Sequence, residues 1–306
     1  MNLDELLHRF QGDLQIRNYS ARTVTDYGYH LGLLRQFLAQ RQLTDIQAVT
    51  TETLTDFQRW VYYQPTKHGT PRSVLNQNGI LAAVKSFFRF LKVEGILVAD
   101  PAEGIEYARE PRSLPRNVLT PQEAKRIIEA VDTTTVLGYR DRTILEVLYA
   151  TGIRNEELRN LTVEDVNLEE GLLRVNRGKG NHDRVTPLGH IACRFLETYL
   201  KDIRPQLLGQ RQSNRLFLSW RGNPLDAHAL GDLVKRHTAL AKIKKHVTCH
   251  LWRHSCATHL LKNNANLRHV QDLLGHRSLA TTERYLRLTI TDLKEAHARF
   301  HPREKL

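Results

Sequence analysis

Four short segments in the second half of the 306-residue chain carry side chains suited to chemistry at a phosphate group. The first segment holds Arg154 and Glu157 three residues apart, and the second holds Lys179 between two glycines. Each such side chain taken alone has an ordinary structural explanation, such as a surface arginine or a core tyrosine. The other two segments hold His250, Arg253, His276 and Tyr285.

Together, these side chains suit the transfer of a phosphoryl group to tyrosine. Arg154 and Arg253 could bind the non-bridging oxygens of a phosphate and stabilise the charge that develops there. Tyr285 could be the nucleophile with a histidine as its base, because forming a phenolate near pH 7 costs roughly 4 kcal/mol without help. Lys179 could protonate the departing sugar oxygen. The arginines would then do the electrostatic work of a metal ion, so we expect no metal and no cofactor.

The charge of the chain indicates a polyanionic partner. The net charge is +12, from 45 Lys and Arg residues against 33 Asp and Glu residues. Residues 1–116 hold 14 basic and 12 acidic residues, so residues 117–306 hold 31 and 21 and carry most of the surplus. A surplus of this size is typical of proteins that bind nucleic acid.

The cysteine content and the hydropathy predict a cytoplasmic protein. The three cysteines are too few for a disulfide framework and fit a reducing compartment. Apolar runs are much shorter than the roughly 18 residues that cross a bilayer, and the acidic first residues do not resemble a signal peptide. We therefore expect a cytoplasmic, nucleoid-associated protein with no membrane partner.

The elements that must position these residues fall into two parts. Residues 1–100 are predicted to be helical, with Ser20 capping one helix and another beginning near Thr51. A long helix is predicted to start at Thr70-Pro71 and to expose a basic face. Four prolines between positions 101 and 121 indicate an interdomain linker over residues 101–120. The basic face comprises Lys85, Arg89 and Lys92.

Residues 121–306 are predicted to be mainly helical with a small β-sheet. Thr120 and Glu123 have the spacing of a capping box at a helix start. Residues 172–175 and the segment around Val185 are predicted to be two strands of a hairpin, with Lys179 at or beside its tip. Further elements are predicted as a short strand at 216–219 and helices at about 138–149, 154–158, 188–203, 226–240, 250–262, 266–274, 280–287 and 291–299.

The chemical segments resemble those of the tyrosine recombinases, also called phage-type integrases, and are most similar to the Xer-like branch. The resemblance rests on Thr-Gly-x-Arg-x-x-Glu-Leu around Arg154, on His-x-x-Arg at His250 and Arg253, and on Leu-Gly-His nine residues before Tyr285. It extends over essentially the whole chain, because the N-terminal helices resemble the core-binding domain of the family. One departure is Trp252, where a smaller aliphatic residue is common.

This resemblance implies a mainly α, two-domain DNA clamp with a small β-sheet in its C-terminal catalytic domain. The implied function is a site-specific DNA recombinase that works through a 3′-phosphotyrosine intermediate and a Holliday junction. The implied roles are phosphate binding by Arg154 and Arg253, protonation of the 5′ oxygen by Lys179, acid–base catalysis by His250, transition-state support by His276, attack by Tyr285 and support of the site by Glu157.

The resemblance also implies partners. One partner is double-stranded DNA with an inverted-repeat core site. The others are further protomers, which form a tetramer on two duplexes; they are copies of this chain or include a related recombinase. The helix at 291–299 would link neighbouring protomers. The DNA contacts expected from charge and resemblance are Lys85, Arg89, Lys92, Lys235 and Arg236.

Three other functions share parts of this pattern. A type IB-like DNA topoisomerase uses similar chemistry but relaxes DNA, and a non-catalytic DNA-binding protein would share the charge and the helices. A metal hydrolase could use His250 and His254, which are four residues apart, but Leu251 stands where a zincin helix needs glutamate. The non-catalytic alternative does not explain why all six catalytic residues occur in the order of the family. The N-terminal helices and the Xer-like tail favour recombination over the topoisomerase.

Overall fold

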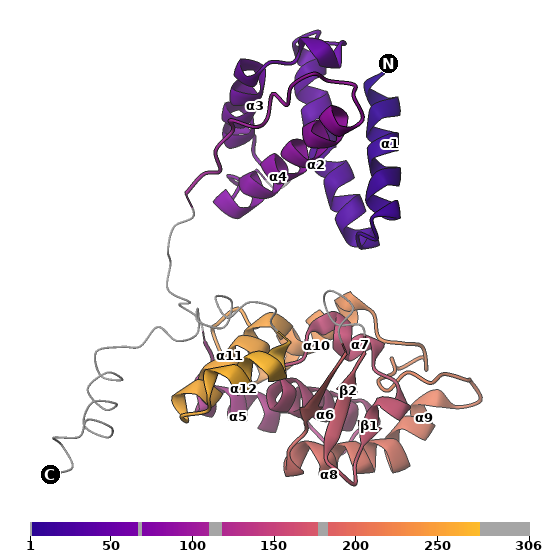
Figure 1. The fold of residues 1–306 in the computed structure, drawn as a ribbon. Helices are drawn as coiled ribbons and strands as arrows, with labels where there is room; N and C mark the ends of the chain where they lie inside the picture. The colour runs from indigo at the N-terminus through magenta and orange to yellow at the C-terminus, as the bar shows by residue number, and fades with distance from the viewer. Residues whose placement is uncertain (1, 67–68, 110–117, 177–182, 276–306) are drawn as a thin grey trace, which may run out of the picture. The chain divides into compact units, whose positions relative to one another are not determined.

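The chain folds into two compact units, residues 1–112 and 113–306, each with a hydrophobic core of its own (Figure 1). The computed structural model describes residues 2–66, 69–109, 118–176 and 183–275. These residues are mainly helical, with a three-stranded antiparallel sheet in the second unit. The predicted fold class is confirmed.

The first unit is a bundle of helices around an aromatic core. Ser20 caps the second helix, with its Oγ accepting from the N–H of Thr23 at 3.1 Å, and Thr50 caps the third. Both starts match the predictions. Phe10, Phe57 and Phe87 are fully buried in the core. The elements are α1 (Leu3–Ile16), α2 (Ala21–Gln40), the 3₁₀ turn η1 (Ile46–Ala48), α3 (Thr51–Tyr63) and α4 (Val74–Val93).

Helix α4 begins three residues later than the sequence predicts. Ser73 is its N-cap, and the Oγ of Ser73 accepts a hydrogen bond from the N–H of Asn76 at 3.2 Å. The predicted cap, Thr70, uses its carbonyl to accept from the N–H of Thr66 at 2.8 Å. Thr70 therefore belongs to the loop before the helix, and Ser73 provides the cap in its place.

The first part of the predicted linker is bound to α4. The side-chain amide of Asn78 both donates to and accepts from the backbone of Ala108, at 2.9 and 3.0 Å. The Nζ of Lys85 donates to the carbonyls of Ile105 at 2.7 Å and Glu103 at 3.3 Å. The chain therefore stays on the first unit for a considerable distance after α4 ends.

The second unit packs helices around a small sheet. Thr120 and Glu123 form the predicted capping box, with bonds of 2.7 and 3.1 Å between the backbone N–H of each and the side chain of the other. Its elements are α5 (Pro121–Glu129), α6 (Val136–Thr151), α7 (Asn155–Asn160), the 3₁₀ turn η2 (Val163–Asp165), β1 (Val166–Asn167), β2 (Leu172–Val175), β3 (Arg184–Pro187), α8 (His190–Thr198), the π-helical turn η3 (Tyr199–Ile203), α9 (Arg204–Leu208), α10 (Ala227–Leu240), α11 (Cys249–Lys262) and α12 (Leu267–Leu274).

The sheet has the order β1-β2-β3 and contains the predicted hairpin. Strands β2 and β3 are antiparallel, with Val175 opposite Arg184 and Leu172 opposite Pro187. The prediction of a strand at 216–219 is wrong, because the pairing of this segment is limited to an isolated bridge between Leu218 and Pro224. Its apolar residues are instead buried in the core of the unit, and burial alone produces such a run.

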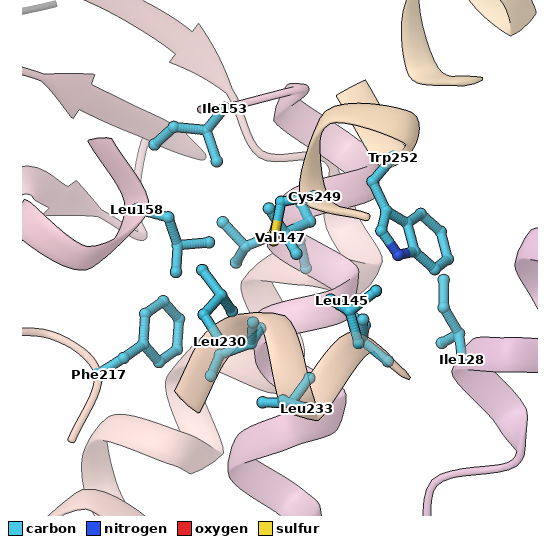
Figure 2. Packing of buried hydrophobic residues seen from close by; sticks show 14 of the residues in the cluster. Ile128, Leu145, Val147, Ile153, Leu158, Phe217, Leu230, Leu233, Cys249 and Trp252 are labelled. Atoms are coloured by element: carbon cyan, nitrogen blue, oxygen red, sulfur yellow. The ribbon is translucent and has the colours of Figure 1, made fainter. Parts of the chain in front are cut away.

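Helix α6 runs through the core of the second unit. Figure 2 shows side chains of α5, α6, α10 and α11 meeting there. Trp252, the large residue at a position where the family commonly has a smaller one, is fully buried among them. The side chains labelled in Figure 2 are Ile128, Leu145, Val147, Ile153, Leu158, Phe217, Leu230, Leu233, Cys249 and Trp252.

Within the described part of the chain, none of the helices combines the length and the apolar character needed to cross a membrane.

Candidate active site

The turn between α6 and α7 positions Arg154. Helix α6 ends at Gly152, whose φ of +58° lies in the left-handed region that favours glycine. A Cβ atom at this position would lie 2.8 Å from the Cδ2 of Leu274 and 3.4 Å from the Sγ of Cys256. The glycine therefore permits both the turn and the close packing, and Arg154 follows it as the N-cap residue of α7.

The first turns of α11 position His250 and Arg253. Thr248 caps this helix by accepting a hydrogen bond at its Oγ1 from the N–H of Leu251 at 3.2 Å. His250 then lies in the first turn and is exposed, whereas Arg253, one turn later, is only 2% exposed. The start of α11 thus carries an exposed imidazole and, one turn later, a buried guanidinium.

Three arginines converge on the C-terminal end of α12. We call Arg154, Arg184 and Arg253 the arginine cluster; they come from the N-cap of α7, from β3 and from α11. The last carbonyls of a helix lack intrahelical partners and carry partial negative charge. Each arginine binds one of three consecutive carbonyls: Arg184 Nε to Leu273 at 3.0 Å, Arg253 Nη2 to Leu274 at 2.7 Å and Arg154 Nη2 to Gly275 at 3.2 Å.

Arg253 also joins two helix ends. Its Nη1 donates to the carbonyl of Gly152 at 2.7 Å, at the end of α6. A guanidinium has five N–H donors in a fixed plane, so bonds to two carbonyls hold its plane rigidly. A buried arginine held in this way is a preorganised positive charge.

Glu157 carries the negative charge of the site. Its carboxylate accepts from the backbone N–H of Arg154 at 2.9 Å, from Arg154 Nη1 at 2.6 Å, and from Arg184 at 2.9 and 2.8 Å. Burial alone would raise the pKa of Glu157, but the hydrogen bonds from Arg184 and Arg154 and their charges lower this pKa to about 2. Glu157 is therefore ionised at neutral pH and fixes the orientation of both arginines.

Burial and nearby positive charges favour the neutral forms of His250 and His254 on α11. Partial burial lowers the pKa of His250, and the charges of Arg253 and Arg154 lower it further. Burial and the proximity of His250 lower the pKa of His254. Near pH 7, His250 can therefore accept a proton, as a general base requires.

The comparison with protein families decides the relationship. Residues 117–291 match the phage integrase family, and residues 7–95 match the phage integrase N-terminal SAM-like domain. The first match covers more than half of the chain. The chain belongs to the phage integrase family.

Relatives of this integrase are similar along the whole chain. It is 35% identical over 302 residues to tyrosine recombinase XerD of Staphylococcus saprophyticus, which covers 98% of this chain and 100% of that protein. It is 36% identical over 290 residues to tyrosine recombinase XerC 2 of Ralstonia nicotianae, covering 94% and 83%. The integrase is thus a tyrosine recombinase, a DNA breaking–rejoining enzyme, and the topoisomerase and non-catalytic alternatives are set aside.

Solved structures share the fold of this integrase. The crystal structure of XerA recombinase matches with a TM-score of 0.55 and 29% identity over 98% of this chain and 99% of that chain. A lambda integrase tetramer bound to a Holliday junction matches with a TM-score of 0.71 and 19% identity, over 93% and 77%. The lambda match shows likeness of fold alone.

The basic residues predicted on α4 lie in different surroundings. Arg89 is exposed, and Lys92 is exposed with its Nζ 3.9 Å from a carboxylate oxygen of Glu103. The ammonium of Lys85 is instead occupied by backbone carbonyls of the segment that follows α4. The sequence placed all three on one basic face, and the structure distinguishes Lys85 from the other two.

The two basic residues predicted on α10 also differ. Lys235 is exposed and lies 3.7 Å from Asp232 on the same helix. Arg236 donates a hydrogen bond to Asp141, a carboxylate that is 1% exposed and that also binds His237 at 2.9 Å and Arg140 at 2.7 Å. The side chain of Arg236 is itself 57% exposed, and it links the surface of α10 to a buried carboxylate on α6.

Three of the predicted catalytic residues, and the helices predicted at 280–287 and 291–299, lie outside the described residues. In the sequence, Lys179 falls between β2 and β3, His276 directly follows the carbonyl bound by Arg154, and Tyr285 comes nine residues later. Among the residues that the structure describes, no group of three or more His, Cys, Asp or Glu side chains could hold a metal ion.

Arg184 is the residue of the cluster that the sequence did not single out. It stands at the start of the strand that returns from the hairpin tip, where a basic residue alone is an ordinary surface feature. The available signal was its position in the segment that carries Lys179. That signal needed the three-dimensional contact with Glu157 to become informative.

Proposed function

We propose that this tyrosine recombinase cuts DNA by forming a 3′-phosphotyrosyl bond through Tyr285, with Arg154 and Arg253 holding the phosphate. The observation that carries this proposal is the meeting of both guanidinium groups at the end of α12, where the chain continues directly to His276. Both charges also act on His250. The two guanidinium groups and the imidazole of His250 are therefore close enough to act on one phosphate, which supports the proposal.

The cleavage step exchanges one bond at phosphorus for another. The Oη of Tyr285 bonds to phosphorus, and the bond from phosphorus to the 5′ oxygen breaks. Neutral His250 accepts the phenol proton, and the ammonium of Lys179 gives a proton to the 5′ oxygen. His276 donates a hydrogen bond to the phosphate. Rejoining is the reverse reaction with a 5′ hydroxyl of another strand as the nucleophile.

Arg154 and Arg253 stabilise the transition state because they are fixed beforehand. Charge grows on the non-bridging oxygens as Tyr285 adds, and each donor aimed at them is typically worth about 10²–10³ in rate. Carbonyls and Glu157 hold Arg154 and Arg253 in place before DNA arrives. Little reorganisation remains for the reaction itself.

We infer that residues 1–100 form a core-binding domain, 101–120 a linker and 121–306 a catalytic domain, which together clamp duplex DNA carrying inverted repeats. Five basic residues are the proposed contacts. Arg89, Lys92, Lys235 and Arg236 are exposed, and Arg236 also donates to the buried Asp141. Lys85 would reach DNA only by releasing backbone carbonyls. Binding through phosphates weakens steeply with salt. DNA as the substrate places the enzyme at the cytoplasmic nucleoid.

We further infer a tetramer on two DNA duplexes, held together through residues from Thr291 onward. The lambda integrase tetramer on a Holliday junction has a related fold. Deletion from Thr291 should abolish recombination and leave binding to a single site intact, and loss of both would contradict the inference. Recombination by this chain alone in a purified reaction would establish a homotetramer; a requirement for a second recombinase would establish a mixed one.

A nicked suicide substrate tests the proposed function. DNA fragments flanking the gene that contain inverted repeats a few base pairs apart are first screened for binding. The bound fragment is then nicked near the cleavage position, so that cleavage traps a covalent adduct visible on a denaturing gel. We expect an adduct with the wild type and none with Tyr285→Phe.

A matched control separates the nucleophile from a general effect of losing a phenol. Tyr62→Phe removes an exposed tyrosine hydroxyl from α3 and should form the adduct like the wild type. Mass spectrometry of the DNA-linked peptide should place the modification at residue 285. An adduct in the Tyr285→Phe variant, or a modification elsewhere, would overturn the assignment.

A further inference from the structure

Arg184 uses all three nitrogens of its guanidinium within the protein. Its Nη1 and Nη2 donate to the two carboxylate oxygens of Glu157 at 2.9 and 2.8 Å, and its Nε donates to the carbonyl of Leu273 at 3.0 Å. The side chain is only 10% exposed. A paired, two-point contact of this kind fixes geometry as well as charge.

Glu157 connects Arg184 to Arg154, so the orientation of Arg154 depends on the contact with Arg184. A carboxylate offers about four acceptor positions, and Arg154 and Arg184 together make four hydrogen bonds to this one. Each oxygen of Glu157 receives one bond from each arginine. Removing Arg184 would leave half of these positions empty and let the carboxylate turn, and Arg154 would turn with it.

Arg184 also contacts the other support of Arg154. A Cβ atom on Gly275 would lie only 3.0 Å from the Cδ and 3.2 Å from the Nη1 of Arg184, so the backbone of Gly275 rests on this side chain. The carbonyl of Gly275 is the group that accepts from Arg154 Nη2. Arg184 therefore lies against both Glu157 and the end of α12, the two points that hold Arg154.

We propose that Arg184 is a positioning residue for the cleavage reaction, which sets the orientation of Arg154 through Glu157 and seats the end of α12. The proposal rests on the proposed function, in which Arg154 binds the scissile phosphate. Arg184 itself does not touch the DNA. It starts the strand that returns from the segment of Lys179, so one side chain connects that hairpin with α7 and with the end of α12.

The experiment compares chemistry with binding. Single-turnover cleavage of the nicked substrate is measured at saturating enzyme, and DNA affinity is measured by fluorescence anisotropy with Tyr285→Phe in every variant. Arg184→Met should slow cleavage by about 10²-fold, the size expected when a catalytic group is displaced by about 1 Å. The dissociation constant should change much less. Arg184→Lys should recover part of the rate, because it restores the charge without the second hydrogen bond to Glu157.

Arg174→Met is the matched control. Arg174 lies on the neighbouring strand β2 and pairs with the buried Asp165 by a longer contact of 3.4 Å. It is an arginine bound to a buried carboxylate on the same sheet, but not one of the cluster. This variant should cleave at the wild-type rate. If its cleavage rate falls as much as that of Arg184→Met, the effect of Arg184→Met reflects general weakening of the sheet, and the proposal is overturned.

A double-mutant comparison tests the route through Glu157. In a Glu157→Gln background, Arg184→Met should slow cleavage much less than it does in the wild type, because the constraint is already weakened. Equal losses in the two backgrounds would overturn the proposal, as would wild-type cleavage by Arg184→Met. If Arg184→Met does not fold, Arg184→Lys in both backgrounds gives the same comparison. Failure of the proposed function is distinguishable, since it would appear as an adduct in Tyr285→Phe.

Discussion

Arg154 and Arg253 donate hydrogen bonds to neighbouring carbonyls in the chain, those of Gly275 and Leu274 at the end of α12. The two arginines come from different elements, and their common support is the last turn of this helix. The end of α12 is therefore a support that the two guanidinium groups share. The same turn leads directly to His276, so the position of α12 couples the proposed phosphate clamp to the segment that carries the nucleophile.

Gly275→Ala should disturb this coupling. Gly275 has a φ of +64°, and an added Cβ would meet Arg184 at 3.0 Å. The left-handed backbone costs about 1–2 kcal/mol for a residue with a Cβ, and the contact with Arg184 adds displacement at the arginine cluster. We expect the cleavage rate of the suicide substrate to fall by ~10-fold or more, with a smaller change in DNA affinity.

Gly95→Ala provides the control for the backbone cost. Gly95 follows the end of α4 with a φ of +70°, and a Cβ there would have nothing within 4 Å. It should lower thermal stability in a similar way and leave the single-turnover cleavage rate close to that of the wild type. Equal cleavage by both variants would show that the contact with Arg184 does not matter for the reaction.

The ionisation of Glu157 should make the second unit sensitive to acid. The pKa of Glu157 is lowered to about 2 in the folded protein, from an ordinary value of 4.5. A lowered carboxyl pKa contributes stability above about pH 4.5, and this contribution is lost as the pH falls towards 2. Its size is on the order of 3 kcal/mol. Urea unfolding followed by circular dichroism between pH 7 and pH 2 measures it.

Glu157→Gln should remove this part of the pH dependence. The variant should be less stable than the wild type at pH 7, because Arg184 and Arg154 lose a buried partner. The difference in unfolding free energy between the two proteins should shrink as the pH falls below 4.5. A difference that is constant over the whole range would contradict the assignment of a low pKa to Glu157.

His250 should stay neutral at a lower pH than an ordinary histidine. Partial burial and the charges of Arg253 and Arg154 lower its pKa below 6.5. A base must be unprotonated to accept the phenol proton, so the fall of the cleavage rate with acid should have its midpoint below pH 6.5. Nuclear magnetic resonance titration of the imidazole gives the pKa directly, and the pH profile of cleavage should agree with it.

Arg154→Met should raise the pKa of His250, because it removes one of the two positive charges that act on the ring. Arg174→Met, on β2, should leave the pKa of His250 unchanged. A pKa of His250 that does not respond to the loss of Arg154 would separate the imidazole from the arginine cluster. The titration is independent of catalysis, so the low activity expected of this variant does not obscure the result.

The sequence predicted the elements whose local signals agree with their packing. Ser20, Thr50 and Thr120 each provide the cap at or beside a predicted start, and β2 and β3 pair as the predicted hairpin. Predictions failed where other contacts outweighed the local sequence pattern. Thr70 belongs to a loop closed by a hydrogen bond from Thr66, so α4 starts after the next cap, Ser73. Residues 216–218 form an apolar run because they are buried in the core, without forming a strand.

The candidate site shows the same division. Arg154, His250 and Arg253 stand in motifs that can be recognised in one sequence, and the structure places the two arginines on one helix end. Arg184 has no such motif here, since its importance lies in a contact with Glu157 across 27 positions of the chain. A basic side chain alone does not reveal whether its partner is a phosphate, a carboxylate or a carbonyl.

Lys85 and Arg89, both predicted as DNA contacts, should respond differently to substitution. An ammonium has three donors, and Lys85 gives two hydrogen bonds to the carbonyls of Ile105 and Glu103, whereas Arg89 is exposed. Arg89→Met should weaken DNA binding and lower the slope of log affinity against log salt by about 0.9, the value for one phosphate contact. Lys85→Met should lower the slope by a similar amount and, unlike Arg89→Met, should also lower the melting temperature, because Lys85 holds the segment after α4 and must exchange its carbonyls for a phosphate. An unchanged slope in Lys85→Met would show that Lys85 keeps its carbonyls when DNA binds and would remove it from the proposed contacts.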